Sequence, residues 1–117
     1  MKLRDIKSTL DAEVFCGGEQ LDREVDHAFS SDLLSDVLAF VDSRTVLLTG
    51  LINTQVIRTA ELIDLPAVIF VRNKKPDPEI IRLARQNRII IMCTKDAMYT
   101  ASGKLYASGL KGIKIAD

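Results

Sequence analysis

The sequence predicts a three-layer α/β domain, in which helices cover both faces of a mainly parallel β-sheet. Short apolar runs alternate three times with segments of helical periodicity, and the connections between them are short. The runs at 45–49, 67–71 and 88–92 are rich in apolar and β-branched residues, as in strands that are buried on both faces. Successive strand–helix units of this kind form right-handed crossovers and therefore a parallel sheet.

The composition agrees with one folded domain over residues 1–117. A chain of this size buries about two-thirds of its unfolded surface and needs no disulfide or metal for stability. Apolar residues make up 47% and charged residues 27%, which is typical of an ordered globular protein. Lys plus Arg and Asp plus Glu number 16 each, so we expect no general attraction to nucleic acid or to an anionic membrane.

The N-terminal part predicts a helix followed by two extended segments. Apolar residues at helical spacing indicate a short amphipathic helix that ends at Asp11. These residues are Leu3, Ile6 and Leu10. Residues 12–16 are typical of a strand that the Gly17-Gly18 pair terminates, and residues 24–29 are interpreted as a second extended segment at a sheet edge.

Cap-type residues predict where the two middle helices begin. Ser30, Ser31 and Asp32 can cap a helix, and the acidic Asp32 suits its positive end. The apolar residues expected on the buried face of this helix are Leu33, Leu34, Val37, Leu38 and Val41. Asn53 or Thr54 can cap the next helix. Its expected core residues are Val56, Ile57, Ala60 and Ile63.

The last two helices have their own start and stop signals. Asp77-Pro78-Glu79 predicts a helix start, because Asp caps free amides and Pro at the first position loses no hydrogen bond. Its expected core residues are Ile80, Ile81 and Ala84. Thr94 and Asp96 can cap the final helix. Its position follows from the spacing of Met98, Ala101 and Leu105, and it ends at Ser108-Gly109. Residues 111–117 form either a frayed end or an added edge strand.

The residues that could support catalysis are poorly arranged for it. His27 follows Asp26 in an extended segment, so the two side chains point to opposite faces, and His27 is expected at the surface. Cys16 has no recognisable general base, and packing at a strand end is its expected role. Ser102-Gly103-Lys104-Leu105 lacks the first glycine and the hydroxyl of a phosphate loop, and Gly17-Gly18 lacks dinucleotide-binding spacing. We therefore expect no enzyme activity.

The sequence also predicts neither metal nor cofactor. Cys16 and Cys93 form no CxxC pair, so reduced thiols are expected. The acidic stretch of Asp22, Glu24 and Asp26 is more typical of a solvated face than of a metal site. The N-terminus lacks the features of a signal peptide and the longest apolar run is far too short to cross a membrane, so a cytoplasmic location is expected.

The sharpest prediction is an anion site where the parallel strands end. Ligands of such sheets bind beyond the carboxyl ends of the strands, near helix N-termini with free amides. Three turns are expected there, at 49–54, 72–76 and 94–96. The candidate ligand-binding residues are Thr49, Gly50, Asn53, Thr54, Arg72, Lys74, Lys75, Thr94 and Lys95. A phosphate or carboxylate would suit these basic and hydroxyl groups, although polar turns and caps of this kind also occur without a ligand.

Three segments carry a family resemblance: Gly18-Glu19-Gln20-Leu21-Asp22-Arg23-Glu24-Val25, Ser31-Asp32-Leu33-Leu34-Ser35-Asp36-Val37 and Val71-Arg72-Asn73-Lys74-Lys75-Pro76-Asp77. With the order of the elements, they make nearly the whole chain similar to the DRTGG domain family. That family resembles the N-terminal domain of bacterial HPr kinase/phosphorylase and also occurs attached to CBS pairs and phosphotransacetylases. The resemblance implies an accessory or regulatory role without catalysis, often in a homo-oligomer. The turns at 49–54 and 72–73 contain no Asp-Arg-Thr or Gly-Gly sequence.

Two main hypotheses for function follow. The first is a regulatory module that senses a small anionic metabolite or nucleotide at the strand ends. The second is a structural interaction or oligomerisation domain, a homodimer or the partner of a larger enzyme, whose docking surfaces are Leu3, Ile6, Leu10, Ile113 and Ile115. A hydrolase or transferase that uses Cys16 is a third, remote alternative.

Overall fold

The order of helices and strands follows the sequence prediction closely. The computed structural model describes residues 1–116. Its helices are α1 (Leu3–Leu10), α2 (Leu34–Phe40), α3 (Thr54–Leu62), α4 (Pro78–Gln86) and α5 (Met98–Ala107). Its strands are β1 (Glu13–Cys16), β2 (His27–Ser30), β3 (Thr45–Thr49), β4 (Ala67–Phe70), β5 (Ile90–Cys93) and β6 (Lys111–Gly112), and a short 3₁₀ turn, η1, spans Gly18–Gln20.

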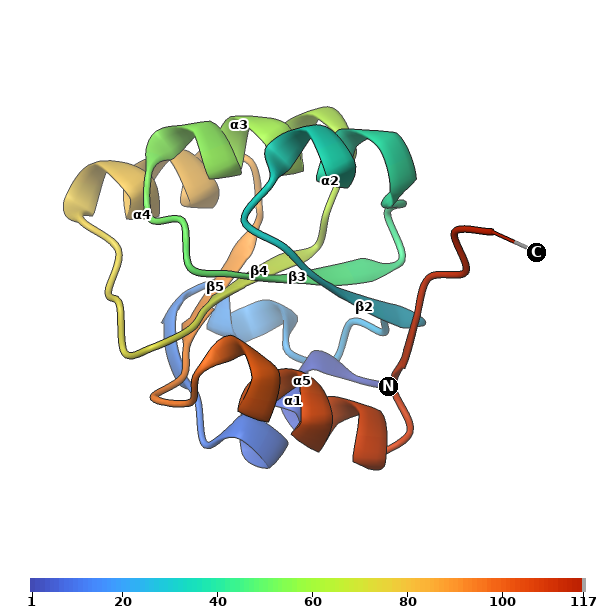
Figure 1. Cartoon of the computed structure of the whole chain (residues 1–117). Helices are drawn as coiled ribbons and strands as arrows, with labels where there is room; N and C mark the ends of the chain where they lie inside the picture. Colours follow the sequence, from blue (N-terminus) through green and yellow to red (C-terminus); the bar gives the residue numbers. More distant parts are fainter. Residues whose placement is uncertain (117) are drawn as a thin grey trace.

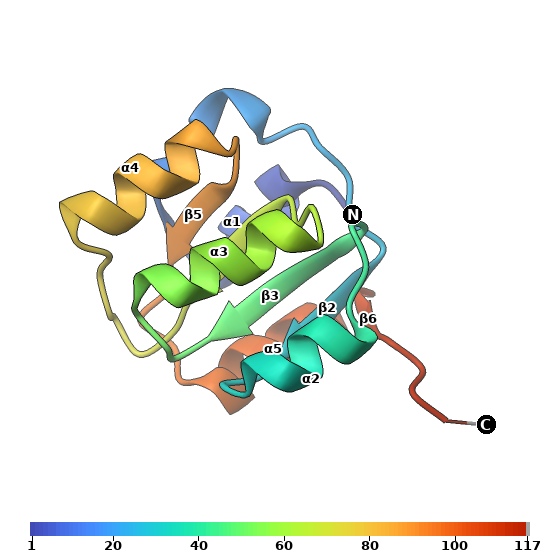
Figure 2. The same cartoon turned by 90° about the horizontal axis from the view of Figure 1, so that it is seen from above.

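The strands form one sheet between two layers of helices (Figure 1). The strand order is β1-β5-β4-β3-β2-β6. Helices α2, α3 and α4 cover one face and helices α1 and α5 cover the other (Figures 1 and 2). The predicted three-layer α/β fold is confirmed. Within residues 1–116, no helix has the length and apolar character needed to cross a membrane.

Strand pairing places the ends of the central strands side by side. Strands β2, β3, β4 and β5 are parallel neighbours, and β1 is antiparallel to β5. At the carboxyl end of the sheet, Thr49 lies opposite Phe70, and Phe70 lies opposite Cys93. The turns that follow β3, β4 and β5 therefore leave the sheet at the same end.

Each face of the sheet packs against its own apolar core. In β3, Val46 and Leu48 face the core under α1 and α5, whereas Leu47 faces the core under α2, α3 and α4. All five residues of β3 are buried. The prediction of strands that are buried on both faces is therefore confirmed, because both layers of helices exclude water from the sheet.

Two predicted helix caps are confirmed and two are wrong. The side chain of Asn53 accepts a hydrogen bond from the Val56 amide, and that of Asp77 accepts one from the Ile80 amide. Helices α2 and α5 have no side-chain cap. The predicted cap residues of these two helices contact other groups: Asp32 binds the turn after β3, Thr94 donates to the Leu10 carbonyl and Asp96 binds Lys104.

The buried face predicted for the helix after Ser31 is only partly correct. Val37 and Val41 are buried, but Leu33 and Leu38 are 56% and 48% exposed. The helix lies near the edge of the sheet, where little protein covers its outer side. The strand predicted at 88–92 begins two residues later in the structure, at Ile90, because Arg88 has a left-handed backbone with φ 57° and belongs to the preceding turn.

The sheet edge beside β2 differs from the prediction. The segment predicted as an edge strand at 24–29 is β2 at His27–Ser30, and the two-residue strand β6 pairs with it on its outer side. Of the two alternatives for residues 111–117, an added edge strand is therefore the one observed, at Lys111–Gly112.

The prediction that the first helix offers a docking surface is wrong. Its apolar residues Leu3, Ile6 and Leu10 lie in the core.

Candidate functional site

The three turns predicted to bind an anion meet at the carboxyl end of the sheet. We call residues 49–54, 72–76 and 94–96 the carboxyl-end rim. They follow the neighbouring strands β3, β4 and β5 directly. Helices α3, α4 and α5 begin just after these turns, so their positive N-terminal ends lie at the same end of the sheet as the rim.

The middle turn of the rim holds Arg72 in an unusual backbone conformation. Arg72 and Asn73 have φ values of 61° and 56°, and the Lys74 amide donates to the Val71 carbonyl at 3.3 Å, as in a type I′ turn. Glycine or asparagine normally occupies the first position of such a turn. The amides of Arg72 and Asn73 donate to Asp96 and Thr94 carbonyls at 2.8 and 2.9 Å, which fixes the turn against its neighbour.

Gly50 makes room for the Arg72 side chain. A methyl group placed on Gly50 would lie 2.7 Å from Nη2 of Arg72 and 3.4 Å from Oδ1 of Asp32. The guanidinium group therefore lies directly against the Gly50 backbone. A glycine at this position has a steric purpose that the sequence alone did not reveal.

Several of the predicted ligand-binding groups are already engaged within the chain. The Thr49 hydroxyl and the Gly50 amide donate to Oδ1 of Asp32 at 3.0 and 2.7 Å. The Lys74 ammonium donates to the Gly50 carbonyl at 2.9 Å. The remaining engaged side chains are Asn53, which caps α3, Lys75, which forms an exposed ion pair with Glu13, and Thr94, whose buried hydroxyl donates to the Leu10 carbonyl.

The groups left for a ligand are fewer than the sequence suggests. Within residues 1–116, no hydrogen-bond or ion-pair partner is found for the side chains of Arg72 and Lys95. Thr54 is the first residue of α3, and the amides of its first turn have no intrahelical acceptor. An anion that contacted Arg72 and the start of α3 would find both positive charge and free donors.

The opposite end of the sheet holds hollows that the sequence did not predict. Two adjoining hollows of about 860 and 490 Å³ share Gln20, Arg88 and Ile89, and we call them together the amino-end groove. Arg85 also lines the groove. The sequence carries no signal for this groove, because its lining comes from segments that only the fold brings together, such as η1 and the turn between α4 and β5.

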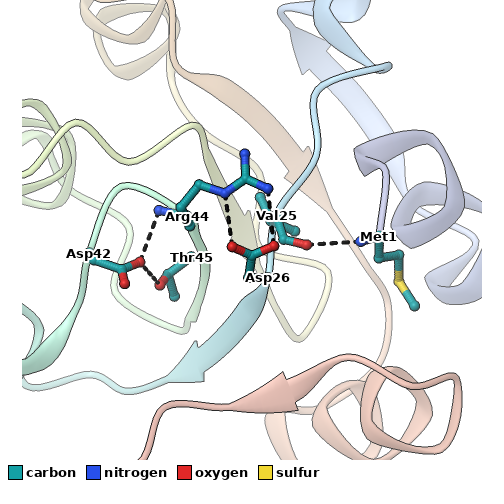
Figure 3. A network of polar contacts seen from close by, with 6 residues as sticks. All are labelled: Met1, Val25, Asp26, Asp42, Arg44 and Thr45. Atoms are coloured by element: carbon teal, nitrogen blue, oxygen red, sulfur yellow. Dashed lines mark hydrogen bonds and ion pairs between the residues drawn. The ribbon is translucent and has the colours of Figure 1, made fainter.

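Asp26, which directly precedes β2, is paired within the chain. Figure 3 shows Asp26 bonded to the Arg44 guanidinium through both oxygens, at 2.9 and 3.0 Å. This hydrogen bond lowers the pKa of the Asp26 carboxyl below its usual value. The prediction of a surface His27 is wrong in detail, because the residue is half-buried and its Nδ1 has no hydrogen-bond partner within the described chain.

Neither thiol is activated as a nucleophile. Cys16 and Cys93 are both free and buried. Burial raises the pKa of Cys16 above its usual value and raises the pKa of Cys93 to about 12. Their sulfur atoms donate to the carbonyls of Ile89 and Lys74. Among the residues that the structure describes, no group of three His, Cys, Asp or Glu side chains could hold a metal ion.

Comparisons with known proteins agree with this architecture. The family model of the DRTGG domain matches residues 5–108. The structure is similar to the crystal structure of the CBS and DRTGG domains of the regulatory region of Clostridium perfringens pyrophosphatase, complexed with the activator diadenosine tetraphosphate, with a TM-score of 0.71 and 20% sequence identity. The match covers 89% of this chain but only 45% of that one. No curated protein matches the sequence.

Proposed function

The chain belongs to the DRTGG domain family, and from this premise we propose that it is a non-catalytic regulatory module that binds a small anionic ligand, such as a nucleotide, at the carboxyl-end rim. The structurally similar pyrophosphatase region is a regulatory region in complex with a nucleotide activator. That likeness makes a nucleotide the first ligand to test.

One observation carries the proposal: within residues 1–116 the guanidinium of Arg72 has no hydrogen-bond or ion-pair partner, and it lies at the end of the sheet where helices present their positive ends. The positive end of a helix does not favour a cation, and the left-handed backbone of Arg72 adds strain of about 1–2 kcal/mol. A bound phosphate would reverse the electrostatic cost and accept paired hydrogen bonds from the guanidinium.

The ligand test uses the full chain with diadenosine tetraphosphate and ATP as probes. We expect either nucleotide to raise the unfolding midpoint, since a ligand at about 100 times its Kd adds about 2.7 kcal/mol of stability. Calorimetric titration then compares Arg72→Gln with the wild type. Loss of the guanidinium group should weaken nucleotide binding by about tenfold or more. No shift with either nucleotide, or equal affinity in Arg72→Gln, would contradict the proposal.

Two further variants separate position from charge. Arg88→Gln removes a guanidinium from the amino-end groove and should leave affinity unchanged, so it is the matched control. Gly50→Ala keeps every charge but displaces the Arg72 guanidinium, because the added methyl would lie 2.7 Å from Nη2. We expect this variant to bind nucleotide several-fold more weakly while it remains folded.

A second candidate function is assembly. We propose that the chain also self-associates as a dimer, or docks on a partner enzyme, in the cytoplasm. This is favoured by large apolar side chains that the fold leaves in water, including Leu62 at 73%, Tyr99 at 90% and Tyr106 at 60% exposure. Of the docking residues predicted from the sequence, Ile115 is 57% exposed, whereas the α1 residues are buried. Light scattering of the full chain tests this candidate directly.

A further inference from the structure

Both tyrosines of the chain lie on one exposed side of helix α5. The sequence contains two tyrosines and no tryptophan, and Tyr99, Gly103 and Tyr106 are spaced at i, i+4 and i+7. Tyr99 is 90% and Tyr106 is 60% exposed. A methyl group on Gly103 would meet no described atom within 4 Å, so packing within the described chain does not require a glycine there. Glycine also weakens a helix interior relative to alanine.

The three residues line a hollow whose chemistry suits a flat aromatic group. It is shallow and mainly apolar, with a volume of about 580 Å³. Small-molecule sites have volumes of about 300–1,000 Å³. The Lys111 ammonium lies 3.9 Å from the centre of the Tyr106 ring and helps to hold the ring in place, while Lys111 itself is not part of the lining. Exposed aromatic rings are the side chains on which nucleobases stack.

Hydrogen bonds connect this hollow to the carboxyl-end rim. The Arg72 amide donates to the Asp96 carbonyl at 2.8 Å, and the Lys104 ammonium, which lines the hollow, donates to the Asp96 carboxylate at 2.8 Å. Tyr99 follows the last turn of the rim by three residues. In that turn, Lys95 has no hydrogen-bond or ion-pair partner within residues 1–116. A ligand whose phosphates contact the rim therefore has the hollow beside it.

We propose that the hollow on α5 binds the base of a nucleotide whose phosphates contact the rim. The base stacks against Tyr99 and lies over Gly103, where any larger side chain would take its place. The ligand class is then a nucleotide, and neither an inorganic phosphate nor a carboxylate metabolite fills the whole site. This inference rests on the proposed anion site at the rim, and its tests separate the base from the phosphates.

The first experiment titrates the full chain calorimetrically with ATP and with inorganic triphosphate, which has a phosphate chain but no base. Tyr99→Ser and Gly103→Leu should each weaken ATP by about tenfold, as expected for one stacked base, and leave triphosphate unchanged. Arg72→Gln should weaken both ligands. Leu62→Ser is the matched control and should change neither affinity, because Leu62 is 73% exposed on α3, which covers the other face of the sheet.

The possible outcomes distinguish the two proposals. ATP binding that neither α5 variant weakens overturns the base site and leaves the anion site at the rim standing. A wild type that binds neither ATP nor triphosphate overturns both. Gly103→Leu should also unfold at a higher temperature than the wild type, since leucine favours a helix interior over glycine. Weaker ATP binding by this variant is then an effect of the filled hollow and not of a destabilised fold.

Tyrosine fluorescence tests the hollow directly, because both tyrosines of the chain line it and the sequence has no tryptophan. We expect ATP to quench this emission with the Kd that calorimetry gives, whereas triphosphate should leave it unchanged. N-acetyltyrosinamide in the same solutions corrects for absorption by the base. Unchanged emission in a chain to which calorimetry shows ATP bound overturns the base site and leaves the tyrosines to the partner surface proposed above.

Discussion

The two ends of the parallel sheet both carry arginines with left-handed backbones, but the electrostatic setting of these arginines differs. Arg72 lies at the carboxyl-end rim, where helices begin, and Arg88 lies at the amino-end groove, where α4 ends. A cation is favourable near the negative end of a helix and unfavourable near the positive end. The negative end of α4 therefore accounts for the positions of Arg85, in its last turn, and of Arg88, just after it. No such helix end accounts for the position of Arg72.

This comparison separates the size of a hollow from its chemistry. The amino-end groove is the larger space, with hollows of about 860 and 490 Å³, yet its arginines already have a stabilising environment. The carboxyl-end rim has most of its polar groups engaged internally, whereas the Arg72 guanidinium has no partner among the described residues. For this reason the ligand site that we propose is the carboxyl-end rim and not the larger groove.

The largest expected effect comes from a pair of glycines, one at each end. A methyl group on Gly17 would lie 2.7 Å from Cγ1 and 3.0 Å from the Cα of Ile90, and Gly17 has φ +83°. Since backbone cannot yield, Gly17→Ala should lower the free energy of unfolding by about 3 kcal/mol. Gly50→Ala meets only the flexible end of Arg72 at the same 2.7 Å, so we expect a loss below about 1 kcal/mol.

Urea denaturation of both variants measures this contrast. Gly18→Ala is the control, because the nearest atom to its added methyl is a Val14 methyl at 4.0 Å. It should be close to wild type. Equal losses for Gly17→Ala and Gly50→Ala would mean that Arg72 is held as rigidly as the backbone of β5, and the rim would then be a structural feature only.

The periodicity of apolar residues predicted the fold well, because the type of each strand and helix depends mainly on the local pattern of apolar and polar residues. The runs that became β3 and β4 are apolar enough to be buried on both faces, and Asp77-Pro78 starts α4 where it should. Helices α2 and α5 begin close to where the sequence predicts, but their predicted caps are wrong, because the side chains of the cap-type residues bind other parts of the chain. The spacing of residues does not show whether a polar side chain caps the nearby helix or binds a group that is distant in the sequence.

The sequence predicted that the three turns of the carboxyl-end rim meet, but not which contacts they make, and ligand binding at the rim stays a prediction. Parallel pairing alone brings the three turns to one end, so their proximity followed from the strand pattern. Which donors stay free depends on Asp32, which binds the Thr49 hydroxyl and the Gly50 amide from a different segment. The sequence also did not predict the strained turn at Arg72, because no sequence pattern indicates that an arginine adopts a left-handed backbone conformation.

A smaller effect tests the backbone strain of the two arginines. Arg72→Gly and Arg88→Gly each place glycine where φ is 61° or 57°, so each should raise the free energy of unfolding by about 0.5–1 kcal/mol. Thermal unfolding without nucleotide measures both. The variants should diverge in binding, since only Arg72→Gly removes the guanidinium that we propose contacts the ligand. A destabilised Arg88→Gly would show that its side chain contributes more to the α4 end than its backbone costs.

The effect that is smallest at neutral pH concerns the two thiols, because it appears only in alkaline solution. The pKa of Cys93 is raised to about 12 by burial, from 9.0 in the unfolded chain. A raised pKa means that the folded state holds the proton more tightly, so the contribution of the thiol is complete below pH 9.0 and is lost as pH rises toward about 12. The stability difference between wild type and Cys93→Ala, measured in urea, should therefore be constant up to pH 9.0 and shrink above it. Cys16→Ala should show the same direction, because its pKa is also raised by burial. A difference that stays flat well above pH 9.0 would indicate that water reaches Cys93 in the folded protein, and would place an opening beneath the 72–76 turn of the rim.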